Sequence, residues 1–249
     1  MQPFVSLSIE NEVGYIEFFH PEHNAMPTEN LLKLEQIITD TGLNDDVKVL
    51  VLKSGGDRTF CAGASFHELL VVNNPDEGQK FFSGFARVIN AMRKCPKLII
   101  GRVQGKTVGG GVGLAAATDY CLATNNASIK LSELSIGIGP FVIEPVVSRK
   151  IGLSAMTQLT LNADTFFSAE YAKQIGLYGS VLDTIEDLDH AVKTLAEKLT
   201  TYNPEALKEI KTVFWENTNH WDALLEERAK ISGKLVLSQF TKDTLKRFK

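Results

Sequence analysis

The chain has 249 residues, of which 44% are apolar and 22% carry a charge, a balance typical of a globular enzyme. Its 30 acidic and 26 basic side chains give a formal charge of −4, which argues against a general nucleic-acid or membrane binder. Three cysteines at unrelated spacings form no zinc or disulfide pattern, and the N-terminal sequence MQPFVSLSIE has no feature of a targeting segment. These observations predict a cytoplasmic protein with reduced cysteines.

The first 140 residues alternate between strand and helix patterns. The expected strands are residues 5–9, 13–19, 47–54, 97–103, 120–124 and 128–131. The first two strands form a hairpin, and helices with one apolar face are expected around residues 31–38 and 81–92, with a short helix from about Phe66. Strands interleaved with helices predict an α/β fold with at least one parallel sheet.

Beyond Phe141 the pattern is almost wholly helical, without a linker or a repeat. We therefore expect a core domain over residues 1–190 and a helical C-terminal region over residues 191–249. A C-terminal third without strands has to dock on the sheet domain or on a neighbouring subunit.

Three consecutive glycines, Gly109 to Gly111, precede the small-residue segment LAAA, a pattern that predicts a turn opening a helix. The N-terminus of a helix presents unpaired N–H donors and the positive end of its dipole, so it favours a developing negative oxygen. Glu133 follows twenty residues after Gly113, at the end of a strand-like run. A carboxylate beside such a turn predicts proton transfer next to a stabilised oxyanion.

A dinucleotide-binding interpretation competes with this one, because Gly111 to Ala116 fits GxGxxA with an acidic residue about twenty positions later. Against it, Gly105 and Lys106 interrupt the strand that should lead into the first glycine. It also leaves unexplained a second small-residue loop, CAGAS at residues 61–65, which precedes a helix as well. Two such loops could direct two N–H groups at one carbonyl oxygen, as in an oxyanion hole.

The segments TFCAGASFHEL, GKTVGGGVGL with Asp119 following, and SELSIGIGP, in this order and spacing, resemble the crotonase (enoyl-CoA hydratase/isomerase) superfamily. The NAM turn at residues 24–26 and the AxxxGL segment at residues 172–177 extend the resemblance over most of the chain. The resemblance implies a spiral of ββα units, a helical C-terminal region used for trimerisation, and a homotrimer or a dimer of trimers. It also implies an acyl-CoA substrate whose thioester oxygen accepts hydrogen bonds from the N–H groups of Ala64 and Gly110.

The acids of this sequence depart from those of a hydratase with two glutamates. The first glutamate position, two residues after the GGG, is Gly113, whereas the second is Glu133. Family members that shift a double bond from the 3,4 to the 2,3 position are similar in keeping only the later glutamate, and they share the pair Pro140–Phe141. We therefore expect isomerisation with Glu133 as proton carrier. The alternative is hydration or dehydration of an enoyl-CoA, such as a branched one, assisted by Glu144 as a second acid or by an unusual arrangement of water.

The resemblance implies further contacts to the substrate or to coenzyme A, at Ala62, Ser65, Phe66, His67, Gly109 and Phe141. Ser65 stands where the family has an aspartate, so its hydroxyl is expected to cap the following helix. Lys246 or Arg247 is expected to reach a phosphate. No metal or redox cofactor is implied, with coenzyme A entering only as part of the substrate. An alternative function of a different class is that of a non-catalytic scaffold that binds acyl-CoA. In that case Glu133 would be dispensable.

Overall fold

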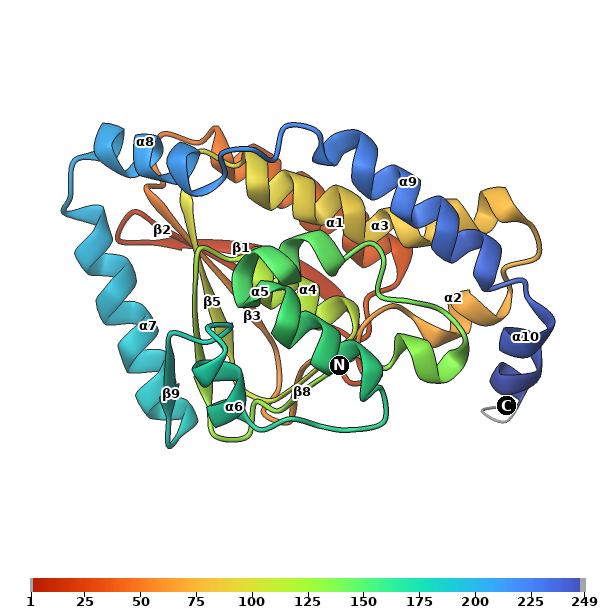
Figure 1. Ribbon diagram of the computed structural model, residues 1–249. Coiled ribbons are helices and arrows are strands. Elements are labelled where there is room, and N and C mark those ends of the chain that lie inside the picture. Colours follow the sequence, from red (N-terminus) through yellow and green to blue (C-terminus); the bar gives the residue numbers. More distant parts are fainter. Residues whose placement is uncertain (1, 247–249) are drawn as a thin grey trace.

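The computed structural model describes residues 2–246 (Figure 1). Its strands are β1 (Phe4–Glu10), β2 (Val13–Phe19), β3 (Val49–Ser54), β4 (Thr59–Cys61), β5 (Leu98–Val103), β6 (Lys106–Val108), β7 (Tyr120–Thr124), β8 (Ile129–Lys130) and β9 (Ser180–Leu182). Its helices are α1 (Thr28–Gly42), α2 (Phe66–Leu70), α3 (Pro75–Lys94), α4 (Gly110–Ala117), the 3₁₀ helix η1 (Glu133–Ile136), α5 (Glu144–Leu161), α6 (Ala169–Gln174), α7 (Ile185–Thr200), α8 (Pro204–Phe214), α9 (Trp221–Leu235) and α10 (Gln239–Leu245).

The strands form two sheets. The larger sheet has the order β1-β2-β3-β5-β7-β9, in which β1 and β2 form the expected antiparallel hairpin and all other neighbours are parallel. The smaller sheet has the order β4-β6-β8 and is parallel throughout.

Consecutive strand pairs divide between the two sheets. In each of the pairs β3–β4, β5–β6 and β7–β8, the first strand joins the large sheet and the second joins the small one. A helix follows each pair: α2 and then α3, α4, and η1. This is the predicted spiral of ββα units, and the prediction is confirmed.

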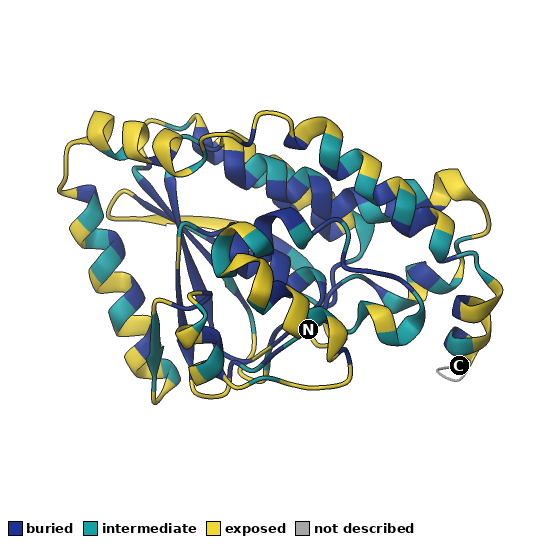
Figure 2. Ribbon diagram, in the orientation of Figure 1, coloured by how far each residue is buried: buried dark blue, intermediate teal, exposed yellow. Residues whose placement is uncertain are grey.

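Helices cover both faces of the large sheet. On one face α7 buries Val192 against Val51 and Ile100, and on the other α1, α3 and α4 build the main core. In Figure 1, α7 runs along one side of the sheet, while α3 and α9 lie side by side beyond its other face. Figure 2 shows the inner strands buried and the edge strand β1 largely exposed. The sheet is thereby enclosed, as parallel sheets require.

Three strands were not anticipated, and two expectations were wrong. β4 and β6 have three residues each, too few for an alternating pattern to be recognised. The C-terminal third does contain a strand, because β9 pairs with β7 and forms one edge of the large sheet. Glu133 opens the helix η1 rather than ending a strand, since β8 stops at Lys130.

The expected domain boundary after residue 190 falls inside α7, which packs on the large sheet. The division of the chain stays a prediction. Over residues 2–246, no helix combines the length and the apolar character needed to cross a membrane. The cytoplasmic location is likewise still a prediction.

Candidate active site

The candidate site lies where the three strands of the small sheet end. Because β4, β6 and β8 are parallel, their carboxyl ends meet at one edge of the sheet. Ala64 follows β4, Gly110 follows β6, and Glu133 follows β8. The repeated ββα unit thus brings together three residues that are separated by up to 69 positions in the chain.

Two backbone N–H groups are free to act at this edge. Gly63 and Gly109, which directly precede Ala64 and Gly110, have φ angles of 92° and 53°, a region that residues other than glycine rarely adopt. A side-chain carbon placed on Gly63 would lie 3.6 Å from the Gly110 nitrogen, so the two loops are in contact. Within residues 2–246, neither the Ala64 nor the Gly110 N–H donates a hydrogen bond. Both donors are available to a ligand oxygen.

The NAM turn holds the first of these loops in place. Met26 donates its N–H to the Gly63 carbonyl at 2.8 Å and accepts from the Ser65 N–H at 3.3 Å, a parallel β-bridge that leaves the intervening Ala64 N–H directed elsewhere. Asn24 adds side-chain hydrogen bonds to the carbonyls of Gly55 and Thr59 at 2.8 and 2.7 Å. The donor is thus oriented by a network that contains no catalytic side chain.

Glu133 supplies the carboxylate. Its Oε2 atom is buried and has no hydrogen-bond partner within the described part of the chain. A side-chain carbon on Gly109 would lie 3.0 Å from the Glu133 Oε1 atom, so the carboxylate lies against the second loop. Burial raises the pKa of the Glu133 carboxyl to about 7, an effect partly offset by a hydrogen bond from its own backbone N–H. A general base with a pKa near neutrality suits proton transfer under ordinary conditions.

These groups face a cavity of about 150 Å³. Aromatic and aliphatic side chains dominate its wall: Phe66, Leu69, Phe81, Phe82, Phe85, Ile136, Ile138, Phe141, Val142 and Ile143. Glu133 is the only ionisable residue among those that line the cavity in the described structure. The arrangement is an apolar pocket with one base and two N–H donors, suited to removing a proton next to a carbonyl group.

Ile143 occupies the space beside Gly113. A side-chain carbon on Gly113 would lie 2.4 Å from Ile143 Cγ2, well inside contact distance. A glutamate at position 113 would therefore require Ile143 to move. The missing first acid is thus accompanied by an apolar side chain that fills the neighbouring volume.

The other expected contact residues divide into two groups. Ala62, Phe66, Gly109 and Phe141 line the cavity, whereas Ser65 and His67 do not. The Ser65 hydroxyl caps α2 by accepting the Glu68 N–H at 3.4 Å, as expected. His67 is exposed, and its Nε2 lies 3.1 Å from Glu22 Oε1.

Glu144 lies outside the cavity. It lines a second hollow of about 330 Å³ together with Arg228, and this hollow shares only Pro140 and Phe141 with the first. The Glu144 carboxylate accepts the Ser148 hydroxyl at 2.7 Å.

The two residues expected to reach a phosphate lie at the C-terminal end of the chain. Lys246 Nζ is 2.7 Å from Asp243 Oδ1, and Arg247 lies outside the described residues.

Sequence reasoning missed several lining residues. Ser232 on α9 reaches the cavity from 99 positions beyond Glu133, and no motif or spacing links the two. Ile143 and Val142 were missed because they follow the recognised motif and look like ordinary core residues.

The free N–H pair, the buried carboxylate and the apolar pocket are together suited to stabilising an oxyanion while a proton is moved. Comparison with known proteins agrees with this class. The family model described as Enoyl-CoA hydratase/isomerase matches residues 8–248, and the chain belongs to this family, the crotonase superfamily. The predicted family is confirmed. The dinucleotide interpretation fails, because Gly111 and Gly113 lie inside α4 and are packed against Cys61 and Ile143.

The relatives include hydratases and isomerases. The chain is 29% identical over 206 residues to a short-chain-enoyl-CoA hydratase of Clostridium acetobutylicum, covering 82% of this chain and 78% of that protein. It is 28% identical over 218 residues to the peroxisomal Delta(3,5)-Delta(2,4)-dienoyl-CoA isomerase of Arabidopsis thaliana, covering 82% and 77%. Among solved structures, an enoyl-CoA hydratase from Bacillus halodurans superimposes with a TM-score of 0.90 at 20% identity, over 98% of this chain and 99% of that one. This last likeness establishes the fold.

Proposed function

We propose that the enzyme acts on an enoyl-CoA thioester and moves its double bond from the 3,4 to the 2,3 position. The N–H groups of Ala64 and Gly110 hold the thioester oxygen. Glu133 takes a proton from C2 and returns one to C4. The expected donors and the expected base remain part of this proposal.

The observation that carries the proposal is that Glu133 is the only ionisable residue lining the described cavity. The α-hydrogen of a thioester is too weakly acidic for a carboxylate to remove unless the enolate oxygen is stabilised. Two preorganised donors provide that stabilisation, and loss of one such donor typically costs about 2.7–4 kcal/mol. One carboxylate is then sufficient, because isomerisation removes a proton and returns one without consuming water.

Hydration of a 2-enoyl-CoA is the second candidate function. It is favoured by the name of the hydratase relative from Clostridium acetobutylicum and by two hydroxyl-bearing residues, Ser132 and Ser232, in the cavity wall. Against it, Ile143 fills the space beside Gly113, and Glu144 lines a different hollow.

The test follows the absorbance of the conjugated enoyl thioester when the purified enzyme is given a 3-enoyl-CoA. We expect absorbance to rise with the wild-type enzyme and the rate to fall by about 10²–10⁴-fold in Glu133→Gln, because acid–base catalysis contributes on this order. Glu144→Gln is the matched control and is expected to keep the wild-type rate.

A flat wild-type trace for short, long and branched 3-enoyl chains would reject isomerisation. Loss of absorbance from a 2-enoyl-CoA would then identify a hydratase. If both assays are flat while acyl-CoA still binds, the non-catalytic scaffold is the correct alternative.

A further inference from the structure

Ser232 contributes a polar group to the cavity that the proposed isomerisation does not use. The residue is 1% exposed and lines the cavity from α9. Within residues 2–246 its hydroxyl makes no hydrogen bond to another protein group, although helical serines often donate to the carbonyl four positions earlier. The hydroxyl is not one of the fully enclosed polar atoms that lack a partner, so it opens onto the cavity that Ser232 lines. A hydroxyl that faces an apolar cavity without a protein partner is satisfied by a ligand or by water.

A close helix crossing sets the position of this hydroxyl. α3 and α9 lie side by side (Figure 1), and a side-chain carbon on Gly78 of α3 would lie 2.6 Å from the Gly233 carbonyl oxygen. Only a glycine pair permits this approach, and it places the neighbouring Ser232 at the cavity wall. The Ser83 hydroxyl donates to Glu226 at 2.7 Å and ties the same two helices together outside the cavity. Ser232 is therefore held by backbone contact rather than by a flexible loop.

The reacting groups and Ser232 come from different parts of the fold. Ala64, Gly110 and Glu133 follow the strands of the small sheet, whereas Ser232 belongs to the wall that α3 and α9 build with Phe81 and Phe82. A cavity of this size holds a group about as large as benzene, which corresponds to an acyl chain of roughly six carbons. With the thioester oxygen at the two N–H donors, a six-carbon acyl group extends through the cavity whose wall includes Ser232.

We propose that Ser232 hydrogen-bonds an oxygen atom carried by the acyl chain, so that the enzyme prefers an acyl-CoA with a hydroxyl group at C5 or C6 over the plain hydrocarbon chain. The proposal rests on the proposed function, since it takes the cavity to be the acyl site. A site built to hydrogen-bond a substrate hydroxyl discriminates against the analogue that lacks it, because the protein group is then left without a partner.

Calorimetric binding of three saturated thioesters tests the proposal: hexanoyl-CoA, 5-hydroxyhexanoyl-CoA and 6-hydroxyhexanoyl-CoA. We expect one hydroxylated thioester to bind the wild-type enzyme about tenfold more tightly than hexanoyl-CoA. Ser232→Ala is expected to abolish that preference while keeping the affinity for hexanoyl-CoA. Ser83→Ala, which removes a hydroxyl from the same helix crossing outside the cavity, is expected to retain it.

Equal wild-type affinities for all three thioesters, or a preference that survives in Ser232→Ala, would overturn the role of Ser232. Because no double bond is present, these outcomes are independent of whether the enzyme isomerises 3-enoyl-CoA. Failure of all three thioesters to bind would overturn both proposals at once.

Discussion

Glu133 lies in surroundings that oppose its own charge. The carboxylate is enclosed by apolar walls, and one of its oxygens has no partner within residues 2–246. The same burial that destabilises the charged form makes the carboxylate a stronger base, since its pKa rises to about 7 from the ordinary 4.5.

This raised pKa predicts opposite effects of pH on activity and on stability. The base must be ionised, so kcat/KM is expected to rise with pH and to level off above about pH 7. Between about pH 4.5 and 7 the unfolded chain releases the Glu133 proton first, so this residue lowers the free energy of unfolding as pH rises. Glu133→Gln cannot ionise and is expected to gain stability over the wild type, by up to about 3 kcal/mol at pH 8 and by little at pH 5. Urea unfolding at both pH values checks this, and a pH-independent difference would contradict it.

Phe141 lines both the cavity that contains Glu133 and the second hollow that contains Glu144 and Arg228. Phe141→Ala is expected to connect the two spaces and to raise kcat/KM for a ten-carbon acyl-CoA relative to a six-carbon one by about tenfold. The physical reason is that each additional buried methylene contributes about 0.8 kcal/mol, so burial of about two of the four additional methylenes accounts for a tenfold change. Leu161→Ala, an exposed position in the second hollow, is the control and should keep the wild-type preference. An unchanged chain-length profile in Phe141→Ala would show that the two hollows do not join.

At the scale of elements, the crossing of α3 and α9 determines the shape of the cavity. A side-chain carbon on Gly233 would lie 2.5 Å from the Gln79 nitrogen, which is backbone and cannot turn aside. Gly233→Ala is therefore expected to separate the helices, to lower the free energy of unfolding by about 1–3 kcal/mol and to weaken acyl-CoA binding. Lys230→Ala, on the exposed side of α9, should stay within about 0.5 kcal/mol of the wild type. Equal stability of the two variants in urea would refute the close crossing.

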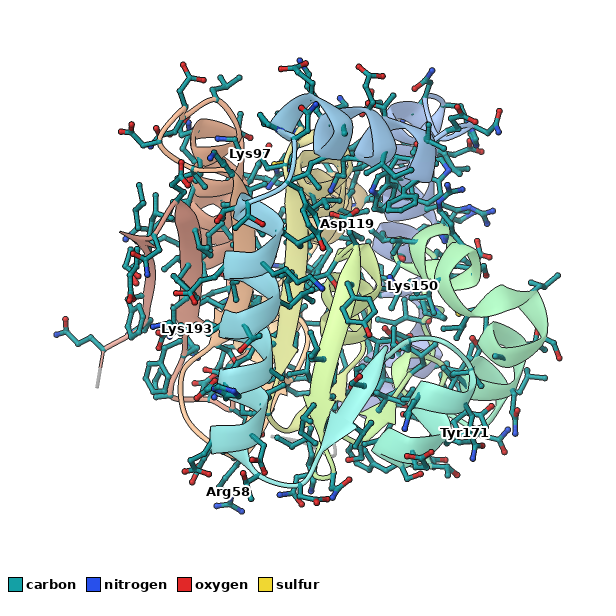
Figure 3. All side chains as sticks on the ribbon, turned by 90° about the vertical axis from the view of Figure 1, so that its left-hand side faces the viewer. Arg58, Lys97, Asp119, Lys150, Tyr171 and Lys193 are labelled. Atoms are coloured by element: carbon teal, nitrogen blue, oxygen red, sulfur yellow. The ribbon has the colours of Figure 1, made fainter. Side chains whose placement is uncertain are left out.

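At the scale of the whole molecule, a buried ion pair joins the C-terminal helices to the large sheet. Lys211 of α8 lies 2.6 Å from Asp119, which precedes β7, and both side chains are at most 5% exposed. Asp119 also accepts the Trp215 indole N–H at 2.9 Å and the Ile99 N–H at 2.7 Å. Figure 3 labels Asp119 and Lys150 close together below α8, where Lys150 Nζ donates to the Asp119 carbonyl. Asp119, the aspartate that follows the GKTVGGGVGL segment, thus has a structural role.

Removing one partner leaves a buried charge uncompensated, so Lys211→Met is expected to lower the free energy of unfolding by about 3–5 kcal/mol. The double variant Asp119→Asn/Lys211→Met should lose less than the single variant, because no unpaired charge remains. Urea unfolding of the two variants makes the comparison. A double variant less stable than the single one would argue against charge as the cause.

The C-terminal helices also expose apolar side chains such as Val213, Phe214 and Phe240. These residues are consistent with burial between subunits. The homotrimer or dimer of trimers implied by the family resemblance stays a prediction.

The sequence by itself determined the fold family, the two N–H donor loops and the choice of Glu133 as the expected base. These features can be recognised because glycines before a helix, a small-residue loop and a carboxylate at a fixed spacing after them are local patterns in the sequence. The short strands β4, β6 and β9 were not predicted from the sequence, because they are defined by the strands that they pair with and not by a pattern in their own residues.

Only the tertiary structure decided what surrounds the carboxylate. Packing of distant elements raises the pKa of Glu133, fills the space beside Gly113 with Ile143 and places Glu144 in a different hollow. It also brings Ser232, which lies 99 positions beyond Glu133 in the chain, to the cavity through the close crossing of α3 and α9 at Gly78 and Gly233. Burial and contact between residues far apart in sequence are properties of the folded chain, and they leave no local pattern in the sequence to be recognised.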